Sequence, residues 1–72
     1  MLFEIKLLVY LKKKYEKKIS LNSYVFLDLN VDSFEFIKLV LEIEKKFNKK
    51  YKPGNFVDFS NLNIKQLSKL FK

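Results

Sequence analysis

The feature that most constrains the fold is an amphipathic segment in the middle of the chain, which follows Asp32 and runs to Phe47. Its apolar residues recur at three- and four-residue steps, which places them along one face of an α-helix. They are Phe36, Ile37, Leu39, Val40, Leu41, Ile43 and Phe47. The charged residues on the opposite face are Glu35, Lys38, Glu42, Lys45, Lys46 and Lys49. Asp32 suits the N-cap, and Glu35 can reach back to the amide of the cap in a capping box. We therefore predict a helix that begins at Ser33 or within one residue of it.

Two other segments carry helical patterns. Residues 2–18 open with a stretch that is apolar nearly all round, typical of a buried helix, and close with a run of lysines. Near the end of the chain, Asn63 is followed by Gln66 at the spacing of a second capping box. The apolar residues after this cap recur at helical spacing and are Ile64, Leu67, Leu70 and Phe71.

The segments between these helices carry turn signals. Pro53-Gly54 is the clearest break in the chain, and we expect a short helical turn from Phe56 to Phe59. Residues 24–27 are apolar and are expected to lie over the helices as a long ordered connection. We predict an all-α fold, a small bundle of three main helices plus one short helix, in a single domain of residues 1–72.

The composition restricts how such a domain is stabilised and what it can catalyse. A domain of 72 residues is marginal unless it packs well. Cysteine is absent, which excludes disulfides and thiolate metal sites, so eight Phe and four Tyr must supply much of the buried area. Histidine, the usual general base, is also absent. Among the carboxylates, Asp32 is expected to cap a helix and Glu42 to pair with Lys45 or Lys46. We therefore expect neither an enzyme nor a metal site.

The chain resembles the acyl carrier protein family over nearly its whole length. The similarity is strongest at residues 28–34, DLNVDSF, and 39–47, LVLEIEKKF. In that family the serine of an Asp-Ser-Leu motif carries 4′-phosphopantetheine, and an Asp-Leu pair lies four residues ahead of the motif aspartate, as Asp28 and Leu29 do here. The resemblance implies that a phosphopantetheinyl transferase moves this group from coenzyme A to Ser33 with Mg²⁺. The chain would then carry acyl groups as thioesters between enzymes of fatty acid, polyketide or related specialised biosynthesis.

Two alternatives to an acyl carrier are open, one of them within the carrier class. Residues 58–67 are similar to the segment by which aminoacyl and peptidyl carrier domains enter their last helix, although the glycine-rich context usual before the serine of peptidyl carriers is missing. Ser33 could also be only a first-turn residue, which is the commonest role of a serine at such a place. A phosphodiester on Ser33 would be favoured physically, because the N-terminus of a helix attracts anions.

The resemblance also implies a partner-binding surface on the helix after the serine. Asp32, Glu35 and Glu44 fall where the family has acidic recognition residues, whereas Lys38 and Lys45 reverse the sign at two other positions. We expect these residues to contact loading ligases and synthase enzymes whose docking surfaces are acidic or mixed.

An apolar strip accompanies these charges. Phe34, Ile37 and Leu41 match the positions that form the apolar docking strip of the family, and the alternative is that they pack on the third helical turn. Of the three, Phe34 and Ile37 are expected to contact partners ahead of Leu41.

The net charge of +7 is the main departure from the acidic carriers of this family. All fifteen basic residues are lysines, as expected either of an AT-rich genome or of selection for a distinct set of partners. A more distant alternative is a module that binds nucleic acid or an anionic membrane without specificity. The lack of arginine argues against sequence-specific reading of bases. With no membrane-spanning or targeting segment visible, we expect a stand-alone cytoplasmic monomer.

Overall fold

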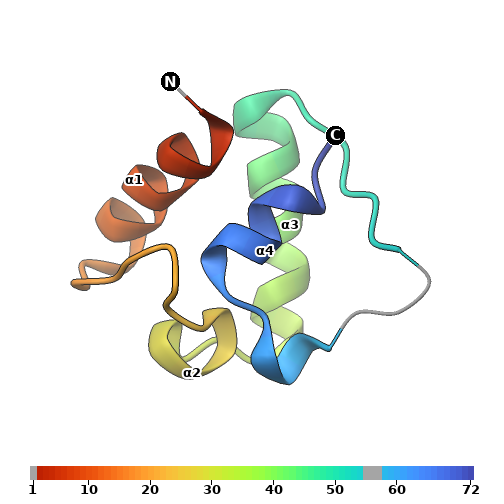
Figure 1. Cartoon of the computed structure of the whole chain (residues 1–72). Helices are drawn as coiled ribbons and strands as arrows, with labels where there is room; N and C mark the ends of the chain where they lie inside the picture. Colours follow the sequence, from red (N-terminus) through yellow and green to blue (C-terminus); the bar gives the residue numbers. More distant parts are fainter. Residues whose placement is uncertain (1, 55–57) are drawn as a thin grey trace.

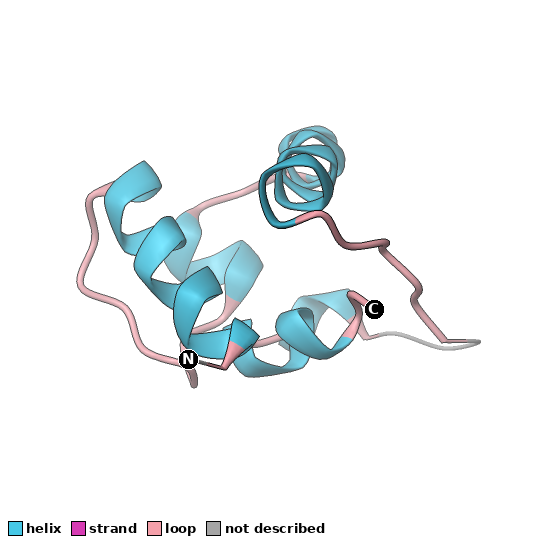
Figure 2. Ribbon diagram, turned by 90° about the horizontal axis from the view of Figure 1, so that it is seen from above, coloured by secondary structure: helices cyan, strands magenta, loops and turns pink. Residues whose placement is uncertain are grey.

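The computed structural model describes residues 2–54 and 58–72. Its elements are α1 (Phe3–Tyr15), α2 (Val25–Leu29), α3 (Ser33–Phe47), the 3₁₀ turn η1 (Phe59–Asn61) and α4 (Ile64–Lys69). Figure 1 shows α3 in the middle of the molecule, with α1 beside it, α2 below and α4 crossing in front. In Figure 2, α3 is seen nearly end-on, with α1 and α4 on neighbouring sides of it. The described residues hold no strand, only two isolated bridges, which confirms the all-α prediction for this part of the chain.

Both ends of the helix α3 are capped by hydrogen bonds to its free backbone groups. Asp32 is the N-cap, and its Oδ1 accepts from the Glu35 N–H at 2.8 Å. The reciprocal half of the predicted capping box does not form, since within residues 2–54 and 58–72 the Glu35 side chain makes no bond to the cap. Asn48 ends the helix in the left-handed conformation, with φ 54°, and donates its N–H to the Glu44 carbonyl. The predicted start of this helix is confirmed.

The helix α1 is shorter than the predicted span of residues 2–18. It ends at Tyr15 because Glu16 adopts a left-handed conformation, with φ 53°, and donates its N–H to the Lys12 carbonyl. The chain then leaves the helix axis, and Ile19 is buried in the core. The prediction was wrong at this end because a run of good helix formers gives no local stop signal.

Residues 24–27 were predicted to lie over the helices as part of a long ordered connection, but most of them belong to the helix α2 (Val25–Leu29). The Asp28 carboxylate accepts from the Tyr24 N–H at 2.6 Å, and Asn30 ends the helix with φ 56°. Val25 and Leu29, four residues apart, are both buried. β-Branched and aromatic residues favour strands by propensity, so tertiary burial decides the structure here.

The C-terminal part contains the second predicted cap. Asn63 Oδ1 accepts from the Gln66 N–H at 2.8 Å, and Gln66 Oε1 accepts from the Asn63 N–H at 3.0 Å. This capping box starts α4, as predicted, but the helix ends at Lys69, before Leu70 and Phe71. The helical turn predicted from Phe56 to Phe59 lies mostly outside the described residues, and Phe59 itself begins η1.

The core lies where α1, α3 and α4 meet. Its largest fully buried side chains are Leu7, Leu11, Val25, Leu39, Ile43, Ile64 and Leu67. Aromatic rings extend the core at one end, where Phe47 makes edge-to-face contacts with Phe3 at 5.3 Å and with Tyr10 at 5.7 Å between ring centroids. Because α1 packs against α4 as well, the helices close around one core and leave one face of α3 to solvent.

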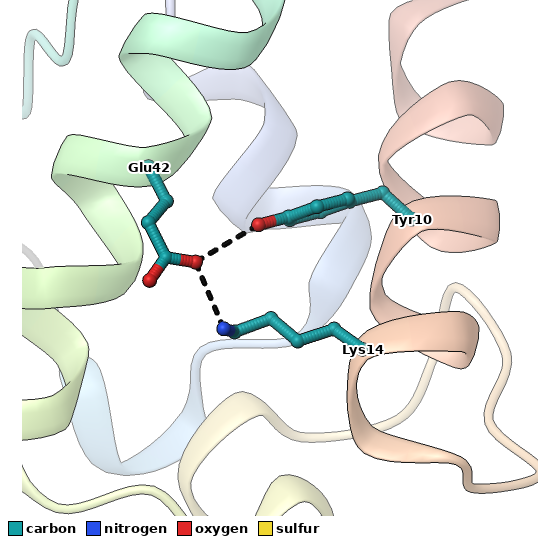
Figure 3. Close-up of polar contacts among 3 residues, drawn as sticks. All are labelled: Tyr10, Lys14 and Glu42. Carbon is teal, nitrogen blue, oxygen red and sulfur yellow. Dashed lines mark hydrogen bonds and ion pairs between the residues drawn. The ribbon is translucent and has the colours of Figure 1, made fainter.

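A polar cluster joins α1 to α3 (Figure 3). The Tyr10 hydroxyl donates to Glu42 Oε1 at 2.9 Å, and Lys14 Nζ lies 2.8 Å from the same oxygen. The predicted pairing of Glu42 with Lys45 or Lys46 along α3 was therefore wrong, because a neighbouring helix offers the carboxylate two donors at once. Hydrogen bonds first to Lys14 and then to Tyr10 lower the pKa of Glu42.

Candidate functional site

Ser33 is the first residue of α3 and is exposed. Its hydroxyl has no hydrogen-bond partner among the residues that the structure describes. Asp32 immediately before it holds the first helical turn through the Glu35 N–H. The serine is thus presented to solvent at the positive end of a 15-residue helix, where negative charge is favoured.

An apolar groove starts beside Ser33. A hollow of about 230 Å³ is lined by Phe26, Ser33, Phe36, Ile37 and Phe59. A second hollow of about 310 Å³ shares three of these side chains and is lined by Phe36, Ile37, Val40, Leu41, Tyr51 and Phe59. The two hollows lie next to each other because they share Phe36, Ile37 and Phe59, and we call them together the apolar groove. An apolar group attached at Ser33 could therefore enter it directly.

Aromatic rings from three elements build the walls of this groove. The Phe36 ring of α3 lies 5.2 Å from the Phe26 ring of α2 and 5.4 Å from the Phe59 ring of η1, measured between centroids. Such offset and edge-to-face pairs are favourable geometries for aromatic side chains. The sequence predicted no role at this site for Phe26, Tyr51 or Phe59, because no local pattern shows that separate segments meet beside Ser33.

The predicted apolar strip lies on the surface of α3. Phe34, Ile37 and Leu41 have exposed fractions of 69%, 60% and 59%. Ile37 and Leu41 also line the groove together with Phe59 of η1, and most of each side chain stays open to solvent. The periodic apolar stripe of α3 is therefore divided between the core and an exposed strip.

The two lysines predicted at the site are more exposed than Glu35 and Glu44. Lys38 and Lys45 are exposed, and Lys38 Nζ lies 4.8 Å from the centroid of the Phe34 ring. Glu44 is half-buried, and its Oε2 accepts from the Tyr51 N–H at 2.8 Å. Glu35 is also half-buried. Glu35 and Glu44, two of the predicted recognition residues, are therefore only partly accessible to a partner.

Tyr15 of α1 lies close enough to Glu35 for the two side chains to interact electrostatically. Burial raises its pKa to about 12, and the negative charge of Glu35 adds to the effect. Its hydroxyl is buried without a partner among the described residues. Tyr15 therefore stays neutral over the physiological range.

Other kinds of site are not evident in the part of the chain that the structure describes. It holds no group of three or more acidic, histidine or cysteine residues placed to bind a metal ion. None of its helices combines the length and the apolar character needed to cross a membrane. No protein-family model, curated protein or solved structure matches the chain.

Proposed function

We propose that this protein is an acyl carrier protein. Ser33 receives 4′-phosphopantetheine from coenzyme A through a phosphopantetheinyl transferase, and the chain presents acyl groups to other enzymes without catalysing a reaction itself. The observation that carries the proposal is the position of Ser33, whose free, exposed hydroxyl begins a long helix and also borders the apolar groove.

The residues around Ser33 fit this prosthetic group. A phosphodiester on the hydroxyl would be placed at the N-terminus of α3, where the helix dipole stabilises an anion. Asp32 keeps the first turn formed by accepting from the Glu35 N–H, so the serine has a fixed backbone position when a transferase binds it. When attached, 4′-phosphopantetheine supplies a flexible arm with a terminal thiol that can hold an acyl group as a thioester.

The groove gives the chain a way to protect an apolar cargo from water. Its lining is almost entirely hydrocarbon, from Phe26 near Ser33 to Tyr51 at the far end. Burial of apolar surface stabilises such contacts by roughly 25 cal/mol per Å². The favoured cargo is therefore an acyl group, and a polar aminoacyl group would gain less from this groove.

Transfer of a fluorescent coenzyme A analogue tests the proposal. The chain is incubated with the analogue, Mg²⁺ and a broad-specificity phosphopantetheinyl transferase, and labelling is followed by in-gel fluorescence. We expect the wild-type chain to be labelled and Ser33→Ala to stay unlabelled. Ser60→Ala, which changes another exposed serine, should be labelled like the wild type. Labelling of Ser33→Ala at the wild-type level would contradict the assignment.

A further inference from the structure

One face of α3 points away from the core and carries a line of exposed residues. Phe34, Lys38, Leu41 and Lys45 are spaced four, three and four residues apart, so they follow one another along the helix, and Ile37 lies beside them. All five are exposed. We call this set the outward face of α3.

Two acidic side chains of α3, Glu42 and Glu44, make contacts within the chain. Glu42 lies toward α1, where it contacts Tyr10 and Lys14 (Figure 3). Glu44 holds the segment after the helix through the Tyr51 N–H. The charges carried by the five residues of the outward face are those of Lys38 and Lys45. Glu42 lies beside this face and interacts electrostatically with Lys38.

One lysine and one aromatic ring of this face form a single unit. Lys38 Nζ lies 4.8 Å from the Phe34 ring centroid, within the range of a cation–π contact. The contact keeps a positive charge over the most exposed ring of α3, one residue from Ser33. A partner that buries Phe34 must therefore also accommodate the Lys38 ammonium.

We propose that the outward face is the docking site for a protein that acts on Ser33, and that the matching surface of this partner is an apolar pocket rimmed by carboxylates. This inference rests on the proposed carrier function and names the kind of partner. Carboxylates opposite Lys38 and Lys45 would speed association and fix the orientation of the complex. A basic surface, by contrast, would be repelled at both positions.

Other occupants fit the outward face less well. A second copy of the chain would bring its own Lys38 and Lys45 against the first pair, with like charges opposed. Each lysine near an anionic membrane contributes only about 1 kcal/mol to the free energy of binding, so the two lysines would give a weak attachment. An apolar protein pocket rimmed by carboxylates would bury the apolar side chains of the outward face and pair with its two lysines.

A charge-swap experiment tests the inference with a defined probe. One probe is a phosphopantetheinyl transferase whose carrier-docking surface is basic, and the other is a variant in which those basic residues are replaced by glutamate. The kcat/KM for modification of Ser33 is measured with both transferases at low and high salt. The substrates are the wild-type chain, Lys38→Glu/Lys45→Glu, and the control Lys12→Glu/Lys13→Glu, which changes the net charge equally on exposed residues of α1.

The wild-type chain should be modified about tenfold faster by the acidic-surface transferase than by the basic-surface one at low salt, and less selectively at high salt. Lys38→Glu/Lys45→Glu should reverse this preference, and Lys12→Glu/Lys13→Glu should keep it. Equal preference in all three chains, or an equal shift in the control, would overturn the inference while leaving the carrier function intact.

Two further outcomes are distinguishable. If neither transferase modifies any variant while each modifies a reference carrier of opposite surface charge, the proposed function itself fails and the inference fails with it. Sedimentation with phosphatidylserine vesicles provides the other arm. Binding to the vesicles that is lost in Lys38→Glu/Lys45→Glu and kept in Lys12→Glu/Lys13→Glu would assign the outward face to a membrane instead of a protein.

Discussion

The Tyr10 hydroxyl of α1 donates to the Glu42 carboxylate of α3 at 2.9 Å, across 32 residues of sequence. Lys14 Nζ shares the same carboxylate oxygen at 2.8 Å. The cluster therefore connects two helices that have no short linker between them. Its contribution is modest, because the Glu42 side chain is 44% exposed and solvent screens the ion pair.

Glu42→Gln tests this cluster through the pH dependence of stability. Contacts with Lys14 and Tyr10 lower the pKa of Glu42 in the folded state. The carboxylate therefore stabilises the fold above its unfolded pKa of about 4.3, and this contribution is lost as the pH falls through the folded pKa. We expect Glu42→Gln to lower the free energy of unfolding by up to about 1 kcal/mol at pH 7 and by less at pH 3.

Urea unfolding at both pH values measures the effect of Glu42→Gln. Glu16→Gln is the control, because it removes the same charge from an exposed residue that ends α1. A loss for Glu42→Gln that is no larger at pH 7 than at pH 3 would contradict a role for the ionised carboxylate.

The capping role of Asp32 can be distinguished from the effect of its negative charge. Asp32→Ala removes the bond to the Glu35 N–H and should cost about 1 kcal/mol of stability. Asp32→Asn keeps an acceptor oxygen and should retain most of that stability. Denaturant midpoints of the two variants give the comparison, and an equal loss in both would show that charge and not capping is what Asp32 contributes.

Two leucines in α3 test which part of the apolar stripe belongs to the core. Leu39 is fully buried, whereas Leu41 is 59% exposed. Leu39→Ala should destabilise the fold by about 2–5 kcal/mol, because it leaves a cavity. Leu41→Ala should change stability by about 0.5 kcal/mol or less. Thermal unfolding of the two variants distinguishes them, and similar losses would mean that the outward face is packed in solution.

The end of α1 offers a stabilising substitution. Glu16 has a φ of 53°, a left-handed conformation that is costly for residues other than glycine. Glu16→Gly should therefore raise the free energy of unfolding by about 0.5 kcal/mol. Lys13→Gly, inside the same helix, should lower it by about 1 kcal/mol. Urea unfolding gives both values, and a destabilised Glu16→Gly would show that α1 does not end there in solution.

The parts of the fold that the sequence predicted are those with local signals. Asp32 and the box of Asn63 with Gln66 mark helix starts through bonds within a few residues, and both starts are confirmed. The end of α1 and the existence of α2 depend on distant contacts instead. Val25, for example, donates its N–H to the Leu62 carbonyl at 2.9 Å, and both residues are buried.

The candidate site was predictable in part for the same reason. The position of Ser33 at the start of α3 follows from its capping neighbour, and its modification stays a prediction. The apolar groove needs Phe26, Phe36 and Phe59 from three elements, which no local pattern brings together. The helical period also left open which apolar residues face the core, because the placement of α1 and α4 decides that Leu39 is buried and Ile37 is exposed.

Intact mass with peptide mapping tests the central claim most directly. The chain is produced together with a phosphopantetheinyl transferase, and its mass is compared with that of Ser33→Ala produced in the same way. We predict the gain of one phosphopantetheine, mapped by fragmentation to Ser33 and absent from the variant. An unmodified chain, in cells where a reference carrier is fully modified by the same transferase, would contradict the account.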